Sequence, residues 1–145
     1  MTLVEGIDHV ELSVPDRFAA AVWYERALGL AIVPEFRDWA ADPRGPLMIA
    51  AGDGTKLALF EGEPPAGRGA PGFRRVAFRT SGTGFLTFLE ELPAKGLAVE
   101  SPHDPVVDHD RAYSIYFTDP WGHLLEVTTY AYGEVTAALG NRPRA

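Results

Sequence analysis

Residues 107–127 read VDHDRAYSIYFTDPWGHLLEV and carry the strongest fold signal in the chain. Two runs of alternating polar and apolar residues flank the tetrapeptide DPWG at 119–122. Proline holds φ near about −65°, glycine allows positive φ, and an aspartate side chain can cap the turn between them. The stretch therefore predicts two antiparallel strands joined by a tight turn, with Tyr116 and Glu126 on neighbouring strands.

The first half of the chain predicts the order β-α-β-β-β. Residues 6–14 alternate with period two, which is typical of a strand with one face on a core. A helix is predicted over 15–30, with Asp16 as N-cap and Gly29 as stop. Its apolar face is predicted to hold Phe18, Ala21, Val22 and Leu28. Three further strand-like runs follow at 30–36, 46–52 and 55–62, separated by Pro, Gly and Asp.

The same order recurs after a Pro/Gly-rich connector at 62–72. The second half predicts a strand at 73–80, a helix at 84–96 with Phe85, Phe88, Leu89 and Leu92 on one face, and strands at 97–102, 112–120 and 123–130. Superposing the halves pairs His9 with Arg75 and Ala58 with Glu126, with one short insertion between the two pairings. We therefore expect one domain of two βαβββ modules, 6–61 and 73–131, followed by a weakly patterned C-terminal tail over 132–145 whose end, GNRPRA, frays.

Composition excludes several classes of function. The chain has 145 residues, 46% of them apolar, no cysteine and a net charge of −7. The negative charge argues against nucleic-acid binding, which needs a basic face. The absence of cysteine excludes disulfides, thiolate metal sites and a cysteine nucleophile. No apolar run reaches the roughly 18 residues of a membrane span, and no basic-then-apolar signal pattern opens the sequence, so we expect a cytoplasmic protein. A small-molecule ligand or a protein partner remains.

A duplicated βαβββ module with a histidine on its first strand and YFTDPWGHLLEV near its end resembles the vicinal oxygen chelate superfamily, from Gly6 to about Tyr130. That group includes glyoxalases, extradiol dioxygenases, fosfomycin-resistance enzymes and bleomycin-resistance proteins. The resemblance implies an α+β fold in which two modules form a curled, cup-shaped mixed sheet with a small-molecule ligand inside. It also implies a homodimer, because members commonly pair their modules across subunits.

The opening stretch is also similar to the extradiol dioxygenase signature. The matching residues are His109, Ile115, Tyr116, Asp119-Pro120, Gly122 and Glu126. In that family the glutamate binds the metal and the histidine acts as an acid/base beside the substrate. The resemblance therefore implies catalytic roles for His109 and Tyr116 and a ligand role for Glu126.

Four inner-strand positions are equivalent in the superposed halves: His9, Ala58, Arg75 and Glu126. A divalent metal (Fe, Mn or Zn) with open positions for substrate requires about three protein ligands. Only His9 and Glu126 can ligate here, because an arginine stays protonated. Arg75 is instead expected to approach Glu126 or to hold an anionic substrate, and this departure puts metal dependence in doubt.

Each candidate residue keeps an alternative. His9 is either a site residue or a polar residue on the wet face of its strand, and His109 is either an acid/base or a loop residue. Tyr113, Ile115 and Phe117 alternate with Ser114, Tyr116 and Thr118, so one of these sets packs under a helix and the other lines the site. Phe117 and Trp39 are expected to contact the substrate, with Trp39 on a loop long enough to form a lid.

Three functions remain open from the sequence. The first is a metal-assisted lyase, isomerase or dioxygenase acting on a small substrate with adjacent oxygens. The second is a metal-free binding or antibiotic-sequestering protein of the bleomycin-resistance type. The third is a metal-free enzyme in which Arg75 holds an anionic substrate or stabilises an oxyanion.

Overall fold

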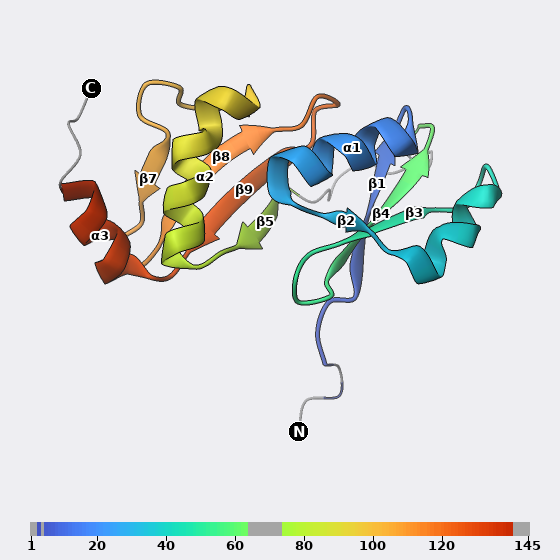
Figure 1. Ribbon diagram of the computed structural model, residues 1–145, viewed down its shortest axis with the longest axis horizontal. Helices are drawn as coiled ribbons and strands as arrows, with labels where there is room; N and C mark the ends of the chain where they lie inside the picture. The colour runs from blue at the N-terminus through green and yellow to red at the C-terminus, as the bar shows by residue number, and fades with distance from the viewer. Residues whose placement is uncertain (1–2, 4, 64–73, 141–145) are drawn as a thin grey trace. The chain divides into compact units, whose positions relative to one another are not determined.

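The computed structural model describes residues 3, 5–63 and 74–140, which form an α+β fold with two mixed sheets (Figure 1). The chain divides into two compact units, Met1–Pro71 and Gly72–Ala145. The expected fold class is confirmed. Among the described residues, no helix is both long enough and apolar enough to span a bilayer.

The first unit has one four-stranded sheet. Its elements are β1 (His9–Val14), α1 (Arg17–Leu28), β2 (Ala31–Ile32), the 3₁₀ helix η1 (Pro34–Ala41), β3 (Leu47–Ala50) and β4 (Lys56–Glu61). The strand order is β1-β4-β3-β2, with β1 parallel to β4 and the other pairs antiparallel.

The second unit repeats this arrangement with additions. Its elements are β5 (Val76–Arg79), α2 (Gly82–Lys95), β6 (Ala98–Val99), β7 (Val106–Asp108), β8 (Tyr113–Thr118), β9 (Leu124–Thr129) and α3 (Tyr132–Gly140). The strand order is β5-β9-β8-β6, β7 also pairs with β8, and β5 runs parallel to β9.

The registers of the two sheets agree with the superposition of the halves. Ala58 lies between Glu11 and Met48 in the first sheet. Glu126 lies between Ala77 and Tyr116 in the second. The two sheets thus place Ala58 and Glu126 at the same point of the same strand arrangement.

The structure departs from the sequence prediction at one strand and in the C-terminal tail. The strand predicted over 30–36 ends at Ile32, because Pro34 begins η1, where its missing N–H costs nothing. The weakly patterned tail forms α3, whose Val135 is fully buried, and the expected fraying of GNRPRA falls mostly on residues outside those described. Most of the predicted connector, 64–72, lies outside the described residues.

Helix α1 has the predicted caps, but of its predicted apolar face only Ala21 is buried. Asp16 accepts hydrogen bonds from the backbone N–H groups of Phe18 and Ala19, and Gly29 ends the helix at φ 74°. The predicted apolar positions Phe18 and Val22 are 43% and 67% exposed. Arg17 is buried instead, at 5% exposure.

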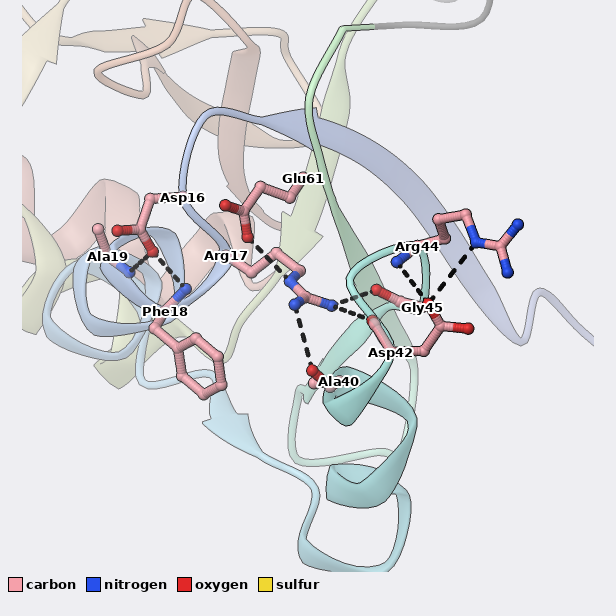
Figure 2. Close-up of polar contacts among 9 residues, drawn as sticks. All are labelled: Asp16, Arg17, Phe18, Ala19, Ala40, Asp42, Arg44, Gly45 and Glu61. Atoms are coloured by element: carbon pink, nitrogen blue, oxygen red, sulfur yellow. Dashed lines mark hydrogen bonds and ion pairs between the residues drawn. The ribbon is translucent and has the colours of Figure 1, made fainter.

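Arg17 is buried because the end of η1 and the loop after it surround its guanidinium with acceptors (Figure 2). Its Nε donates to Glu61 Oε2 at 3.2 Å. The terminal nitrogens donate to the carbonyl oxygens of Ala40 and Asp42, each at 3.2 Å, and of Gly45. One side chain therefore ties the start of α1 to the end of β4 and to the η1 segment.

The turn at 119–122 forms as the sequence predicts. Asp119 Oδ1 accepts from the backbone N–H groups of Trp121 at 3.0 Å and His123 at 2.8 Å, and Gly122 has φ 97°. The His123 imidazole adds a 2.5 Å contact between Nδ1 and Asp119 Oδ2. This closed turn holds β8 and β9 in the register that places Tyr116 opposite Glu126.

Candidate active site on the second sheet

The two faces of the second sheet have different roles. Tyr113, Ile115 and Phe117 face α2 and are buried, with the Phe117 ring 5.6 Å from that of Phe88. Ser114 and Tyr116 alternate with them and lie across from Thr128 and Glu126 of β9. Phe117 therefore belongs to the core under the helix, and the expectation that it contacts a substrate does not fit this placement.

His109 and Tyr116 meet on the face opposite α2. His109 Nε2 and the Tyr116 hydroxyl share a hydrogen bond of 2.8 Å, with the rings edge to face at 86°. His109 follows β7 and Tyr116 lies on β8, so the pairing of these two strands brings them together. The spacing of seven residues, taken from the dioxygenase resemblance, corresponds here to a direct contact.

Arg75 lies against the same tyrosine. Its guanidinium carbon is 4.5 Å from the centroid of the Tyr116 ring, a cation–π arrangement. Nη1 donates to the carbonyl oxygen of Leu125 at 3.1 Å, and Nη2 donates to Glu100 Oε1 at 3.0 Å. The arginine thus pairs with Glu100, where the sequence had led us to expect Glu126.

Glu126 accepts a hydrogen bond from Ser114, a residue that was not among the predicted site residues. Ser114, which is 1% exposed, donates its hydroxyl to Glu126 Oε1 at 2.6 Å and lies 3.1 Å from Thr128 Oγ1. Such a short O–H···O⁻ distance is typical of a charge-assisted bond. The alternation of β8 already placed Ser114 on the face of Tyr116, and this pattern could have found it. We call Arg75, His109, Ser114, Tyr116 and Glu126 the Tyr116 cluster.

His9 lies in the first unit, on β1, between two carboxylates. Its Nδ1 is 2.8 Å from Asp8 Oδ2 and its Nε2 is 3.3 Å from Glu11 Oε2. Lys56 also contacts Asp8, at 3.1 Å. The Asp8 hydrogen bond raises the pKa of His9, and the hydrogen bond from His9, followed by that from Lys56, lowers the pKa of Asp8.

These shifts predict a pH-dependent contribution to stability. A raised histidine pKa stabilises the fold below the ordinary value of 6.5, and this is lost as pH rises through the folded value. A lowered carboxyl pKa stabilises the fold above the ordinary value of 3.8. This contribution is lost as the pH falls through the folded value. We expect the difference in unfolding free energy between the native protein and His9→Asn to be larger at about pH 5.5 than at about pH 8.5. Urea unfolding measures it, with His103→Asn as control; a difference that grows toward pH 8.5 would contradict it.

Trp39 also lies in the first unit, on η1, where the sequence predicted a lid loop. Its ring stacks on Phe36 with centroids 4.5 Å apart, and it is 46% exposed. Because Arg17 holds the backbone at Ala40, Trp39 stands on an anchored 3₁₀ helix.

The described residues do not offer a donor set for a resident metal. They contain no group of three or more His, Asp or Glu side chains placed to hold an ion. The position equivalent to Glu126 is Ala58, which has no donor, and the position equivalent to His9 is Arg75, whose guanidinium is engaged by Glu100. Both nitrogens of His9 already face carboxylates. A metal-ligand role for His9 and Glu126 thus stays a prediction without a third partner.

Comparison with known proteins identifies the family. The model described as "Glyoxalase/Bleomycin resistance protein/Dioxygenase superfamily" matches residues 6–127. The chain belongs to this superfamily. Virulence protein STM3117 of Salmonella typhimurium is 31% identical over 133 residues, which cover 88% of this chain and 86% of that protein.

Solved structures agree with this assignment. The crystal structure of virulence protein STM3117 superposes with a TM-score of 0.63 at 26% identity, covering 89% of this chain and 99% of that chain. Oxidase ChaP-H2 gives a TM-score of 0.65 at 26% identity, covering 92% and 99%. The fosfomycin resistance protein FosX of Listeria monocytogenes gives 0.65 at 17% identity, covering 92% and 99%, which is a likeness of fold alone.

Proposed function

We propose that the Tyr116 cluster is an active site for proton transfer on a small substrate with adjacent oxygen atoms. The observation that carries the proposal is the 2.8 Å hydrogen bond between His109 and Tyr116, with Glu126 directly opposite Tyr116 on β9. An imidazole at this distance from a hydroxyl has the geometry that general acid–base catalysis requires. The name of one structural neighbour at 26% identity, Oxidase ChaP-H2, is in keeping with an enzyme.

Each member of the cluster has a role in this proposal. Tyr116 passes a proton between the substrate and His109, and His109 holds it. Glu126 is a second proton acceptor, and Ser114 fixes the orientation of its carboxylate through Oε1. Two acid–base groups on facing strands suit the removal of a proton from one atom of a substrate and its return to a neighbouring atom.

Arg75 supplies the positive charge. A guanidinium has five N–H donors in a fixed plane and binds carboxylates and oxyanions well. The contacts with Glu100 and Leu125 use only part of this capacity. We propose that Arg75 attracts a negatively charged substrate oxygen to the Tyr116 cluster.

The donor set makes isomerase or lyase chemistry the preferred form of this proposal. Ring opening with dioxygen requires a metal held by about three protein donors, and no group of three such side chains was found among the described residues. Proton transfer needs only the groups that the cluster contains.

Hydrogen–deuterium exchange tests the proposal even though the substrate has not been identified. The native protein would be incubated in D₂O with a panel of α-hydroxyketones, α-ketoaldehydes and catechols, and ¹H NMR would follow each C–H signal. Exchange or conversion of at least one compound by the native protein, and its loss in Glu126→Gln, is the expected result. Compounds that bind without exchange or conversion would contradict it.

A metal-free binding protein of the bleomycin-resistance type is the second candidate. Ala58 favours it, because the first unit has no donor at the position of Glu126. In that case calorimetry with bleomycin would show stoichiometric binding that is unaffected by chelator, and no compound of the panel would be converted.

We also propose that the protein is a homodimer. Phe18 and Val22 expose apolar surface on α1, and the edge strands β1 and β5 leave one side of each sheet unpaired within its own unit. Sedimentation at micromolar concentration is expected to show a species of twice the chain mass. A single 15.8 kDa species at high concentration would contradict this.

A further inference from the structure

The loop that carries His109 contains a residue in the left-handed backbone region. Asp110 has φ 66°, and it is the only non-glycine residue with positive φ among those described. Aspartate tolerates this region better than most residues, yet the conformation is still strained and persists only where neighbouring contacts impose it. Such residues concentrate at functional sites.

Asp108 imposes the conformation from within the loop. Its Oδ1 accepts a hydrogen bond from the backbone N–H of Asp110 at 2.8 Å. The backbone N–H of His109 donates to the carbonyl oxygen of Ala112 at 2.9 Å. These two bonds close the turn over 108–112. His109 lies between Asp108 and Asp110, the two residues that the first bond joins.

The C-terminal helix holds that carboxylate from outside the loop. The Tyr132 hydroxyl, in the first turn of α3, lies 2.9 Å from Asp108 Oδ1 and 3.0 Å from Oδ2. The hydrogen bond to Asp108 raises the pKa of Tyr132, so the hydroxyl stays a donor. Asp108 thus receives hydrogen bonds from Asp110 on one side and Tyr132 on the other.

Tyr132 is itself fixed by packing. Its ring stacks on that of Tyr113 with centroids 4.7 Å apart and planes at 7°. The Tyr113 hydroxyl lies 2.7 Å from Thr136 Oγ1 on the next turn of α3, and Val135 is fully buried. The helix is therefore docked on β8 by contacts that do not involve the 108–112 turn.

We propose that Tyr132 is a positioning residue for His109: through Asp108 it sets the 108–112 turn so that the imidazole reaches the Tyr116 hydroxyl. This inference rests on the proposed function, in which that contact moves the proton. It makes α3 a working part of the site, although none of its residues belongs to the Tyr116 cluster.

Two matched variants test the inference. Tyr132→Phe keeps the stack on Tyr113 and removes the hydroxyl that reaches Asp108. Tyr113→Phe removes a hydroxyl from the same stack, the one that contacts Thr136 and the Tyr132 hydroxyl, and keeps the hydroxyl that reaches Asp108. Both variants remove one tyrosine hydroxyl. An effect seen in both variants therefore reflects the docking of α3, and an effect seen only in Tyr132→Phe reflects the conformation of the 108–112 turn.

The first readout does not depend on activity. In protein with ¹⁵N-labelled histidine, the imidazole nitrogens of His109 can be assigned by their loss in His109→Ala, since the chain has only four histidines. We expect Tyr132→Phe to shift these resonances toward those seen in Tyr116→Phe, and Tyr113→Phe to leave them in place. Unchanged His109 resonances in Tyr132→Phe would overturn the positioning role, whatever the function of the site.

The second readout is catalytic. Misplacing a catalytic group by about 1 Å can cost up to roughly 100-fold in rate. We expect Tyr132→Phe to lower kcat by about 10- to 100-fold with KM changed less than about twofold, and the double variant with Asp108→Ala to be no slower than Asp108→Ala alone. Equal loss of kcat in Tyr132→Phe and Tyr113→Phe would mean that Tyr132 only docks α3 on the sheet and does not position His109. If His109→Ala leaves turnover unchanged while Tyr132→Phe shifts the resonances, the proposed function fails and the positioning stands.

Discussion

His109→Ala is expected to lower kcat by about 10²- to 10⁴-fold on a substrate that the native protein converts, because a positioned general acid–base group contributes a factor of that size. The Nε2 atom lies 2.8 Å from the Tyr116 hydroxyl, which is within the range for proton transfer. KM should change much less, since the imidazole already has a protein partner in the resting site. Steady-state kinetics on a compound from the exchange panel measures both constants.

Two further variants define what a loss in His109→Ala means. Tyr116→Phe removes the other half of the hydrogen bond and should lower kcat by a similar factor, with a double variant that is little worse than either single one. His103→Ala removes an exposed histidine outside the cluster and should leave kcat unchanged. An unchanged kcat in His109→Ala would return His109 to an ordinary loop residue.

Arg17→Ala is expected to lower the free energy of unfolding by about 3 kcal/mol, the largest effect on stability that we foresee for a charged residue. The side chain is 7% exposed and donates to three carbonyl oxygens and to Glu61. Its removal leaves the carbonyl groups of Ala40, Asp42 and Gly45 without their donor in a part-buried place. Urea unfolding gives the value.

The same variant should loosen η1 and change the emission of Trp39, which stands one residue before Ala40. Arg17→Lys is the sharper comparison, because an ammonium keeps the charge but cannot span three carbonyl groups in one plane. We expect it to recover less than half of the loss. Arg37→Ala, at an exposed position on η1, is the matched control for removing an arginine. Equal stability of Arg17→Ala and Arg37→Ala would contradict the anchoring role of Arg17.

The sequence predicted those features that depend on residues close together in the chain. The DPWG turn, the alternation of 112–120 and the caps of α1 depend on residues close in sequence, and the structure has all three. The positions of Tyr116 and Glu126 on facing strands followed from the turn alone. The equivalence of Ala58 and Glu126 followed from the repeat, because both sheets use the same parallel pairing of their first and last strands.

Contacts between distant segments could not be predicted in the same way. Arg17 had the pattern of a solvent-facing helix residue, and its burial depends on carbonyl groups more than 20 residues away. Arg75 was predicted to lie on a strand over 73–80, but it precedes β5 (Val76–Arg79), and its guanidinium pairs with Glu100 because the chain after β6 runs beside Tyr116. The tail showed little pattern, since α3 is held by Val135 and by contacts of Tyr113 and Tyr132 instead of a long apolar stripe.

Turnover of the native protein before and after exhaustive treatment with a chelator tests most directly the claim that the Tyr116 cluster works by proton transfer through its own side chains. We predict that the chelated protein keeps its full kcat, while His109→Ala lacks it with or without added metal. Loss of turnover on chelation, with recovery on addition of Fe²⁺, Mn²⁺ or Zn²⁺, would contradict this claim.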